Sequence, residues 1–278
     1  MAVHMRWSST VLCLFFLGVL AVPCFAEWDI LAPGLELREF FMPGPGGNDV
    51  AGAQGSVAVL RIDPEKFSLR IGSVLTTGQA STALDWARNY GFVAVINAGM
   101  FRADDRQRST GYLRDGDLVV NSFVHPDYGA FLLFGPREPG LPLVRWVDRR
   151  ATPDWEQILA QYDGVIQNYR LFSAERTNIW PPDERRHSAA AIGMDQQGKV
   201  VFVHCRPKVS MYEFAQALLD LPLDLIGAMY VEGGADAAMY VQANGWVGRW
   251  VGEYRTSFFQ SSNTNFWPVP NVLGILPK

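Results

Sequence analysis

Residues 226–245 read IGAMYVEGGADAAMYVQANG, and this pattern decides how the C-terminal third of the chain can fold. Two apolar runs, each long enough for a buried β-strand, flank the segment 232–236. An Asn-Gly pair at 244–245 predicts a tight turn into the next strand. A carboxylate at the end of a buried strand is costly unless it is satisfied by partners. The pattern therefore predicts that a strand carries Glu232 to the rim of a pocket, where the glycines leave room for a ligand.

Apolar and amphipathic runs on either side of this stretch predict the other elements. Strands are expected at residues 56–62, 67–75, 91–101, 130–135 and 163–171, with hairpins at 111–121 and 189–205. Helices are expected at 81–90, 152–162 and 210–221, and the last begins with a capping box of Ser210 and Glu213. The first two strands are expected to pair around Asp63 and Pro64. The pattern predicts an α+β or mixed α/β fold, with one domain in which helices flank a mixed β-sheet.

The first residues have the pattern of a secretory signal peptide. Arg6 precedes an apolar run over 11–22, and Ala26 ends a small-residue cleavage site. We expect cleavage after Ala26 and an exported protein, periplasmic or secreted. A retained N-terminal anchor is the alternative, while Pro23 disfavours a lipoprotein at Cys24. The apolar run is shorter than the ~20 residues of a spanning helix, so we expect no stable membrane span after cleavage.

Three segments are expected along the chain: a signal peptide at 1–26, a strand and Pro- and Gly-rich loop at 27–55, and one large domain at 56–278. A hydrophobic content of 49% is enough for a packed core, and the net charge of −4 argues against a nucleic-acid partner. Cys205 would be the one cysteine left after cleavage and is expected to be a buried, inert thiol. No metal-ligand or phosphate-loop motif is present, so we expect no metal and no cofactor.

Polar residues end three of the predicted strands. Asn97 ends one strand, Gln167 and Asn168 end another, and Glu232 ends the third. In α/β sheets, ligands bind outside strand ends, where side chains converge. The glycines that would let the backbone approach a ligand there are Gly99, Gly233 and Gly234. The pattern predicts a shared polar site; the alternative is that each polar side chain satisfies the backbone of its own turn.

Five segments, in order, resemble the phosphodiester glycosidase family. They are INAGMF (96–101), GVIQNYRLF (164–172), HSAAAIGMDQQGKVVFVHC (187–205), SMYEFAQALLDL (210–221) and MYVEGGADAAMYV (229–241), and the resemblance covers residues 56–251. The family includes the lysosomal enzyme that removes N-acetylglucosamine from phosphodiesters on mannose chains. Its best-known members carry Asp-Gly-Gly-Gly-Ser where this chain has Glu-Gly-Gly-Ala-Asp at 232–236. Many members also carry an arginine at the position that corresponds to Ala189. These differences indicate a bacterial-type exported member and leave its substrate and its activity open.

The resemblance implies a hydrolase that cleaves the C1–O bond between a sugar and a phosphodiester. A phosphate monoester leaves as a stable anion, so one carboxylate near C1 and cations near the phosphate would suffice. The catalytic candidates are Glu232, as base or nucleophile, then Asp236 and His187. Candidate phosphate ligands are Arg185, Arg186 and Arg206. Asn97, Gln167 and Asn168 would hold sugar hydroxyls or phosphate oxygens.

A second function of a different class is a non-catalytic envelope protein that binds glycans or polysaccharides on the same fold. Trp180, Trp246 and Trp250 would then stack on sugar faces, although core packing is the alternative interpretation for Trp250. His204 is expected to be a core or edge histidine, and His125 to belong to a turn. The two functions differ at Glu232, because hydrolysis requires its carboxylate whereas binding tolerates glutamine.

Overall fold

The computed structural model describes residues 27–42, 56–102, 105, 108–254 and 263–278. The predicted signal peptide, and the loop that follows the N-terminal strands, therefore lie outside the described residues. Within these ranges no helix is both long enough and apolar enough to cross a membrane.

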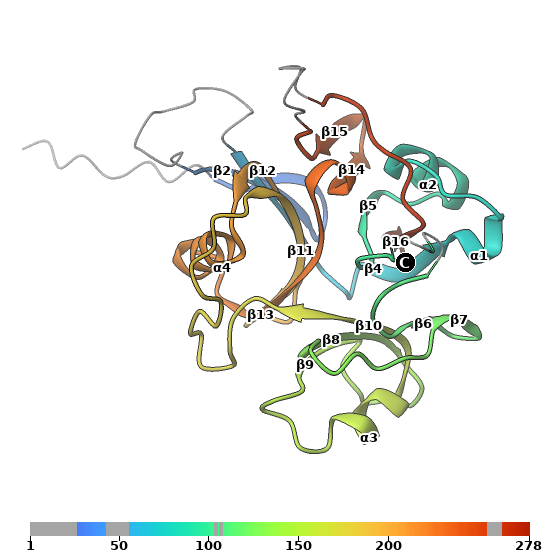
Figure 1. Cartoon of the computed structure of the whole chain (residues 1–278). Helices are drawn as coiled ribbons and strands as arrows, with labels where there is room; N and C mark the ends of the chain where they lie inside the picture. Colours follow the sequence, from blue (N-terminus) through green and yellow to red (C-terminus); the bar gives the residue numbers. More distant parts are fainter. Residues whose placement is uncertain (1–26, 43–55, 103–104, 106–107, 255–262) are drawn as a thin grey trace, which may run out of the picture.

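The described chain forms two β-sheets (Figure 1). The larger sheet has the order β1-β2-β3-β12-β11-β13-β10-β6-β7, with β8 beside β10 and β9 beside β8. Its strands are β1 (Asp29–Ala32), β2 (Leu35–Phe41), β3 (Ser56–Ile62), β6 (Leu113–Asp115), β7 (Leu118–Asn121), β8 (Ala130–Pro136), β9 (Val144–Asp148), β10 (Tyr162–Arg170), β11 (His187–Asp195), β12 (Val200–Val209) and β13 (Leu225–Gly233). The smaller sheet has the order β15-β14-β5-β16-β4, with strands β4 (Phe67–Ser73), β5 (Ala94–Asn97), β14 (Ala238–Ala243), β15 (Trp246–Val251) and β16 (Asn271–Pro277).

The predicted fold class, an α+β or mixed α/β domain with helices flanking a mixed sheet, is wrong. All strand pairs within the described residues are antiparallel, and the sixteen strands far outnumber the four short α-helices. The physical reason lies in the connections. Antiparallel neighbours need only a short turn between them, whereas parallel neighbours need a crossover of a dozen or more residues, usually helical. The three predicted helices do form, but they do not serve as crossovers between parallel strands.

The two sheets pack face to face, and the main core lies between them (Figure 1). Leu60 and Ile192 enter this core from the larger sheet, and Ile96 and Leu273 enter it from the smaller one; all four are fully buried. Burying one such side chain contributes roughly 1.5–3 kcal/mol. The core is therefore a sheet-on-sheet interface, which the alternating apolar patterns of the strands supply from both sides.

The helices lie on the outer faces of the sheets. Trp86 of α2 (Ala83–Tyr90) packs against the smaller sheet, and Phe214 of α4 (Met211–Asp220) packs against the larger sheet. Ile158 of α3 (Trp155–Ala160) packs against β8 and β10, and α1 (Val74–Thr77) follows β4. The capping box of α4 is confirmed, because both Ser210–Glu213 hydrogen bonds are present.

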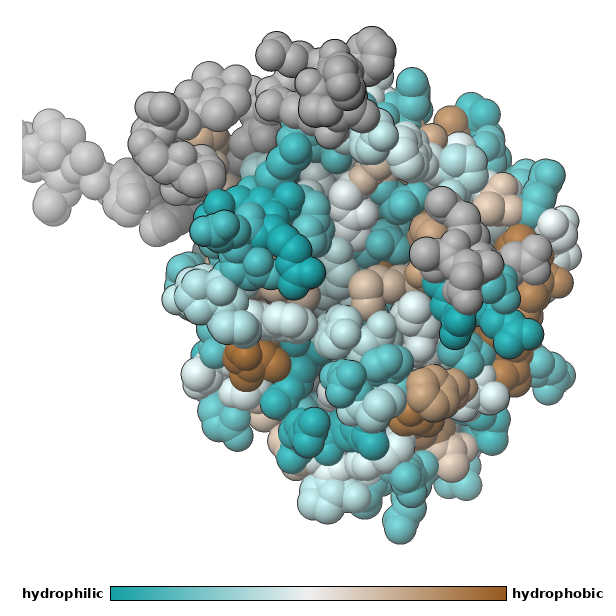
Figure 2. All heavy atoms as spheres, in the orientation of Figure 1, coloured by the Kyte–Doolittle hydropathy of each residue, from teal (hydrophilic) through white to brown (hydrophobic). Residues whose placement is uncertain are grey.

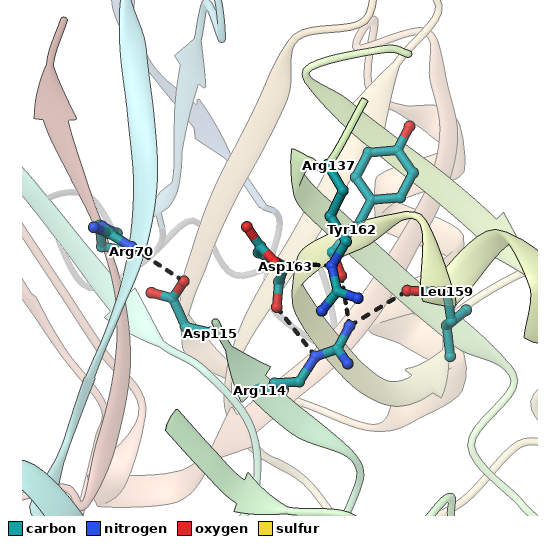
Figure 3. Close-up of polar contacts among 7 residues, drawn as sticks. All are labelled: Arg70, Arg114, Asp115, Arg137, Leu159, Tyr162 and Asp163. Atoms are coloured by element: carbon teal, nitrogen blue, oxygen red, sulfur yellow. Dashed lines mark hydrogen bonds and ion pairs between the residues drawn. The ribbon is translucent and has the colours of Figure 1, made fainter. Parts of the chain in front are cut away.

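Arg114 of β6 satisfies one carbonyl in the last turn of α3 and two carbonyls at the start of β10 (Figure 3). Its guanidinium donates to the backbone oxygens of Leu159, Tyr162 and Asp163, while Arg137 pairs with the Asp163 carboxylate at 2.9 Å. The last carbonyls of a helix have no partners within the helix, so an arginine is well suited to this position. This cluster anchors α3 to the larger sheet.

Local turn signals were read correctly, but one strand pairing was not. The hairpins at Asp115-Gly116 and Asn244-Gly245 join β6 to β7 and β14 to β15, as predicted. The predicted pairing of residues 56–62 with 67–75 is wrong, because β3 pairs with β2 and β12 whereas β4 pairs with β16. The turn after Asp63 carries the chain from one sheet to the other.

The face of the molecule seen in Figure 1 is largely hydrophilic, with small separate apolar patches (Figure 2). Large contiguous apolar patches mark protein or membrane interaction sites. This face therefore presents mainly polar side chains to its surroundings.

Candidate active site

Glu232 lies at a β-bulge near the end of β13. Ala190 of β11 is opposite Glu232, but the next residue, Ala191, is opposite Tyr230, so Val231 is the extra residue. Val231 is fully buried in the main core, and Glu232 is half-buried. A bulge bends a strand and re-aims its side chains, and bulges are over-represented next to active sites. The bulge therefore explains how a buried strand presents a carboxylate at its end.

The two glycines after Glu232 are required for different reasons. A Cβ atom at Gly233 would lie 1.9 Å from the Tyr230 hydroxyl oxygen and 2.5 Å from Cδ2 of His187. Gly234 has space around it but a φ of +63°, which favours glycine. Close packing at one position and backbone conformation at the next thus explain the Gly-Gly pair.

The turn that follows, a 3₁₀ segment at Gly234–Asp236, is clamped by side chains from other elements. Asn97, at the end of β5, donates from Nδ2 to the Asp236 carbonyl at 3.0 Å and accepts from the Ala238 N–H at 2.8 Å. Nε2 of His204, fully buried in β12, lies 3.3 Å from the Ala237 carbonyl. Asn97 therefore joins the smaller sheet to the turn beside Glu232, and its amide is used for that purpose.

A histidine and a tyrosine lie beside this turn. Nε2 of His187 is 3.0 Å from the Tyr230 hydroxyl. Burial lowers the pKa of His187, with a further contribution from Arg185. Burial raises the pKa of Tyr230 well above its usual value, and the Glu232 carboxylate adds to this shift. A neutral His187 and a protonated Tyr230 therefore border the turn at neutral pH.

The charge of Glu232 also acts on a second tyrosine, Tyr128, from a different loop. Oε1 of Glu232 accepts the Gly233 N–H at 3.0 Å, which orients the carboxylate. The pKa of the buried Tyr128 is raised, mainly by burial, and Glu232 contributes to the shift. The Tyr128 hydroxyl donates to Oγ1 of Thr110 at 2.9 Å. Tyr128 is thus bonded to the loop that contains Thr110 and is influenced by the charge of Glu232.

Of the two amides predicted on β10, only Asn168 has an unused polar atom. Its Oδ1 is buried and has no hydrogen-bond partner among the described residues. Its Nδ2 lies 2.7 Å from the point where a Cβ of residue 99 would stand, so Gly99 makes room for it. Gln167 instead makes hydrogen bonds to backbone groups of Tyr112, His125 and Tyr128 with both ends of its amide.

The three predicted phosphate-binding arginines are engaged with other protein groups. Arg185 is exposed and pairs with Asp183 at 3.0 Å. Arg186 makes a two-pronged pair with the capping-box residue Glu213, and this pair holds the pKa of Glu213 at about 2. Arg206 donates to the carbonyls of Val251 and Asn263. Arg185 influences His187 electrostatically, while Arg186 and Arg206 serve the helix start and the C-terminal segment.

Sequence reasoning missed several residues of this region, namely Tyr128, Tyr230, Arg102 and Arg108. The two tyrosines resemble ordinary core residues in a sequence. The two arginines lie in the loop beyond Asn97, and the sequence does not show that this loop pairs with itself and so brings them together. A cavity of about 350 Å³ lies here and includes Arg102, Arg108 and Thr110 in its lining. A larger cavity of about 640 Å³, beside α2 and the β14–β15 turn, contains none of the predicted site residues.

Other predicted features lie as follows. Cys205 is fully buried, as predicted, and burial raises the pKa of its thiol. The Trp180 indole donates to the Arg170 carbonyl, and the Trp250 indole donates to Glu39, so both rings are fixed by the protein. Trp246, the first residue of β15, is 37% exposed. Within the described ranges, no group of three His, Cys, Asp or Glu side chains is arranged to hold a metal.

Comparison with known proteins places this geometry in a family. The family model described as phosphodiester glycosidase matches residues 90–276. The chain belongs to the phosphodiester glycosidase family. The resemblance seen in the sequence is thereby confirmed, and the bulge, Glu232 and the Gly-Gly turn all fall within the matched residues.

The fold agrees with solved structures. The zebrafish N-acetylglucosamine-1-phosphodiester alpha-N-acetylglucosaminidase catalytic domain, auto-inhibited by its pro-peptide, is similar with a TM-score of 0.62 and 13% identity, over 89% of this chain and 85% of that one. A hypothetical protein from Synechocystis is similar with a TM-score of 0.58 and 14% identity, over 91% of this chain and 64% of that one. No curated protein matches the chain. The phosphodiester glycosidases are hydrolases of sugars linked through phosphodiesters, and this chain shares their domain.

Proposed function

We propose that this phosphodiester glycosidase cleaves the C1–O bond between a sugar and a phosphodiester in the cell envelope or its surroundings. The observation that carries the proposal is the bulge in β13, which presents the Glu232 carboxylate at a strand end beside the His187–Tyr230 pair. Membership of the family supports the substrate class. Export of the chain rests on the sequence pattern of residues 1–26.

The reaction needs one carboxylate near C1. As a base, Glu232 takes a proton from water while the water oxygen bonds to C1. The bond between C1 and the phosphate oxygen breaks, and its electron pair leaves with the phosphate. As a nucleophile, Glu232 bonds to C1 first, and water then releases the sugar. In both routes the products are the free sugar and a phosphate monoester, a stable anion that needs little protonation.

The surrounding residues have supporting roles in this proposal. Asn97 and the two glycines fix the turn, and Gly233 N–H orients the carboxylate. Asn168 is the remaining candidate for an amide that holds the sugar, because its Oδ1 has no hydrogen-bond partner among the described residues. Asp236 and His187 remain the next catalytic candidates after Glu232.

Isotope transfer from water tests the bond that breaks. The methyl phosphodiester of N-acetylglucosamine 1-phosphate is incubated with residues 27–278 in water enriched in ¹⁸O, and both products are analysed by mass spectrometry. The proposal predicts that the label enters the sugar. Label in the phosphate would mean that the P–O bond breaks, which contradicts it. The anomeric form of the first product, seen by NMR, separates the routes: inversion indicates a base and retention a nucleophile.

Glycan binding without catalysis stays the second candidate because of one observation. Two half-buried aromatic rings, Tyr169 and Trp180, lie with their centroids 5.5 Å apart. Rings of this kind stack on sugar faces. Binding of glycan phosphodiesters with no release of sugar in the same assay would favour this function.

A further inference from the structure

Two arginines that the sequence did not single out are brought together at the neck of the loop after β5. The Arg102 N–H donates to the Arg108 carbonyl at 3.1 Å, and an isolated bridge joins Phe101 to Ser109. Thr110 N–H and Oγ1 both donate to the Met100 carbonyl. These bonds place Arg102 and Arg108 opposite each other, and both side chains line the cavity of about 350 Å³.

His125 lines the same cavity and is held there by Gln167. The Gln167 amide accepts the His125 N–H at 2.9 Å and donates to the His125 carbonyl at 2.9 Å. Nδ1 of His125 accepts the Asp127 N–H at 3.2 Å, so the proton of the neutral ring is on Nε2. The ring stacks on Tyr128 with a centroid distance of 4.0 Å. Gln167 therefore acts as a positioning residue for a histidine that can donate a hydrogen bond.

The cavity wall combines positive charge with hydrogen-bond donors. Its described lining contains no acidic side chain, and Ser109 adds a hydroxyl group, whereas the Thr110 hydroxyl already donates to the Met100 carbonyl. Arg108 pairs with Asp105 at 3.2 Å, but the two side chains are 70% and 40% exposed. Such an exposed pair contributes little, so Arg108 can exchange it for a bound anion at small cost. Two guanidinium groups with neighbouring donors are the chemistry that recognises phosphate.

The cavity adjoins the candidate active site through Tyr128. The Tyr128 hydroxyl binds Thr110 of the cavity wall, and the Glu232 carboxylate acts on the same tyrosine. A ligand that reached from Glu232 past Tyr128 would thus place its next group against the arginines.

We propose that this cavity, built by Arg102, Arg108 and His125, is the binding subsite for the phosphate half of the substrate, that is, the phosphate monoester with the alcohol that carries it. The identity of the occupant rests on the proposed function. The prediction that the cavity binds an organic phosphate does not rest on the proposed function, because binding needs no turnover.

Phenyl phosphate is the probe, and binding is measured by isothermal titration calorimetry with residues 27–278. The variants Arg108→Gln and Arg102→Gln are each expected to raise the Kd at least ~10-fold, the scale of one lost charge-assisted contact. Arg137→Gln, an exposed arginine on the distant α3 cluster (Figure 3), is the matched control and is expected to keep the parent Kd. Glu232→Gln is also expected to bind, since its change affects chemistry alone.

Three results would overturn the proposal. Phenyl phosphate could fail to bind the parent, or its affinity could be unchanged when Arg102→Gln and Arg108→Gln are combined. Arg137→Gln could also lose as much affinity as the two cavity variants. Both arginines are exposed, so the variants are expected to fold, and thermal unfolding checks this. His125→Gln gives a further variant with the same expected loss of affinity. Should turnover fail while phenyl phosphate binds through these arginines, the function proposed above is contradicted and the subsite is retained.

Discussion

Gly233 is the residue at which a single added carbon would disturb the candidate active site. The site for its Cβ is already filled by the Tyr230 hydroxyl and the His187 ring. His187 and Tyr230 are in turn linked at 3.0 Å, so neither can move alone. The glycine is therefore explained by its neighbours and not by a turn conformation.

We predict that Gly233→Ala destabilises the protein by about 1–3 kcal/mol and lowers turnover, because the new methyl group displaces the Tyr230 ring. Combining it with Tyr230→Phe removes the nearest atom and is expected to restore part of both losses. Urea unfolding and initial rates measure the two effects. If the double variant is no better than the sum of the single variants, the steric explanation is wrong.

The buried His204 is expected to make the free energy of unfolding depend on pH. Burial lowers its pKa from 6.5 to about 4. The unfolded chain therefore binds a proton more readily, and stability that is complete above about pH 6.5 is lost as the pH falls towards 4. We expect the parent to lose about 2 kcal/mol of unfolding free energy from this group between pH 7 and pH 5.

The matched variant for this pH effect is His204→Asn, whose side chain does not titrate. It is expected to be less stable at pH 7 but to show a flatter pH dependence in urea titrations. Glu213, whose pKa is held at about 2 in the folded protein, stabilises the fold fully at pH values above the pKa of a glutamate in the unfolded chain. It therefore adds little to the change in stability between pH 7 and pH 5. His187 acts in the same direction, so some slope remains. An unchanged slope in the variant would contradict the assignment.

Single residues could be predicted from the sequence where the reason was local. Glu213 in its capping box was such a case, whereas the catalytic role of Glu232 stays a prediction. The roles of Gln167, Arg186 and Arg206 could not be predicted, because their partners come from distant segments. Arg102 and Arg108 were missed because what brings them together is the pairing of a loop with itself.

At the scale of elements, the turn at Gly234–Asp236 depends on a clamp from the opposite sheet. Asn97 joins the end of β5 to this turn with two hydrogen bonds and is 1% exposed. Clamp and bulge together fix the carboxylate at a point where the two sheets meet.

We predict that Asn97→Ala lowers stability by about 2–4 kcal/mol, because two buried backbone groups lose their partner. It is also expected to lower turnover by more than the loss of folded protein explains. Arg114→Met is the matched control, since its hydrogen bonds go to the carbonyls of Leu159 and Asp163 and not to the turn (Figure 3). It is expected to lose stability while its folded fraction keeps normal turnover. Equal kinetic effects in both variants would exclude a special role for the clamp.

Strands and hairpins were predictable because their signals are local, as at Asn244-Gly245. The partner of a strand was not predictable in the same way. β3 and β4 are both apolar and follow one another closely, yet they belong to different sheets. Nothing in either strand specifies which edge it joins, since that depends on strands far along the chain.

At the scale of the whole molecule, the fold is two antiparallel sheets that share one core, and the C-terminal strand completes the smaller sheet. β16 lies between β5 and β4 and pairs with both. The predicted helix-flanked sheet failed because apolar runs do not reveal whether a helix or a second sheet covers them. The family resemblance, carried by short segments in order, predicted the domain correctly. The hydrophobic patterns of the strands and helices did not predict the fold class correctly.

Truncation after residue 270 tests this architecture. The shortened chain would lack a central strand and expose two edges and part of the core, so we predict that it does not fold. Circular dichroism melting and soluble yield measure this. Removing only Lys278 is the control and is expected to leave the protein intact. A cooperative melt of the truncated chain would show that the smaller sheet is not built as described.

The central claim is that the Glu232 carboxylate acts at the sugar carbon. The most direct measurement is the turnover number of Glu232→Gln beside the parent, with a chromogenic aryl phosphodiester of N-acetylglucosamine as substrate. The account predicts a loss of at least ~100-fold at unchanged melting temperature, the scale of a missing acid–base group. Turnover within a few-fold of the parent would contradict it and transfer the chemistry to Asp236 or His187.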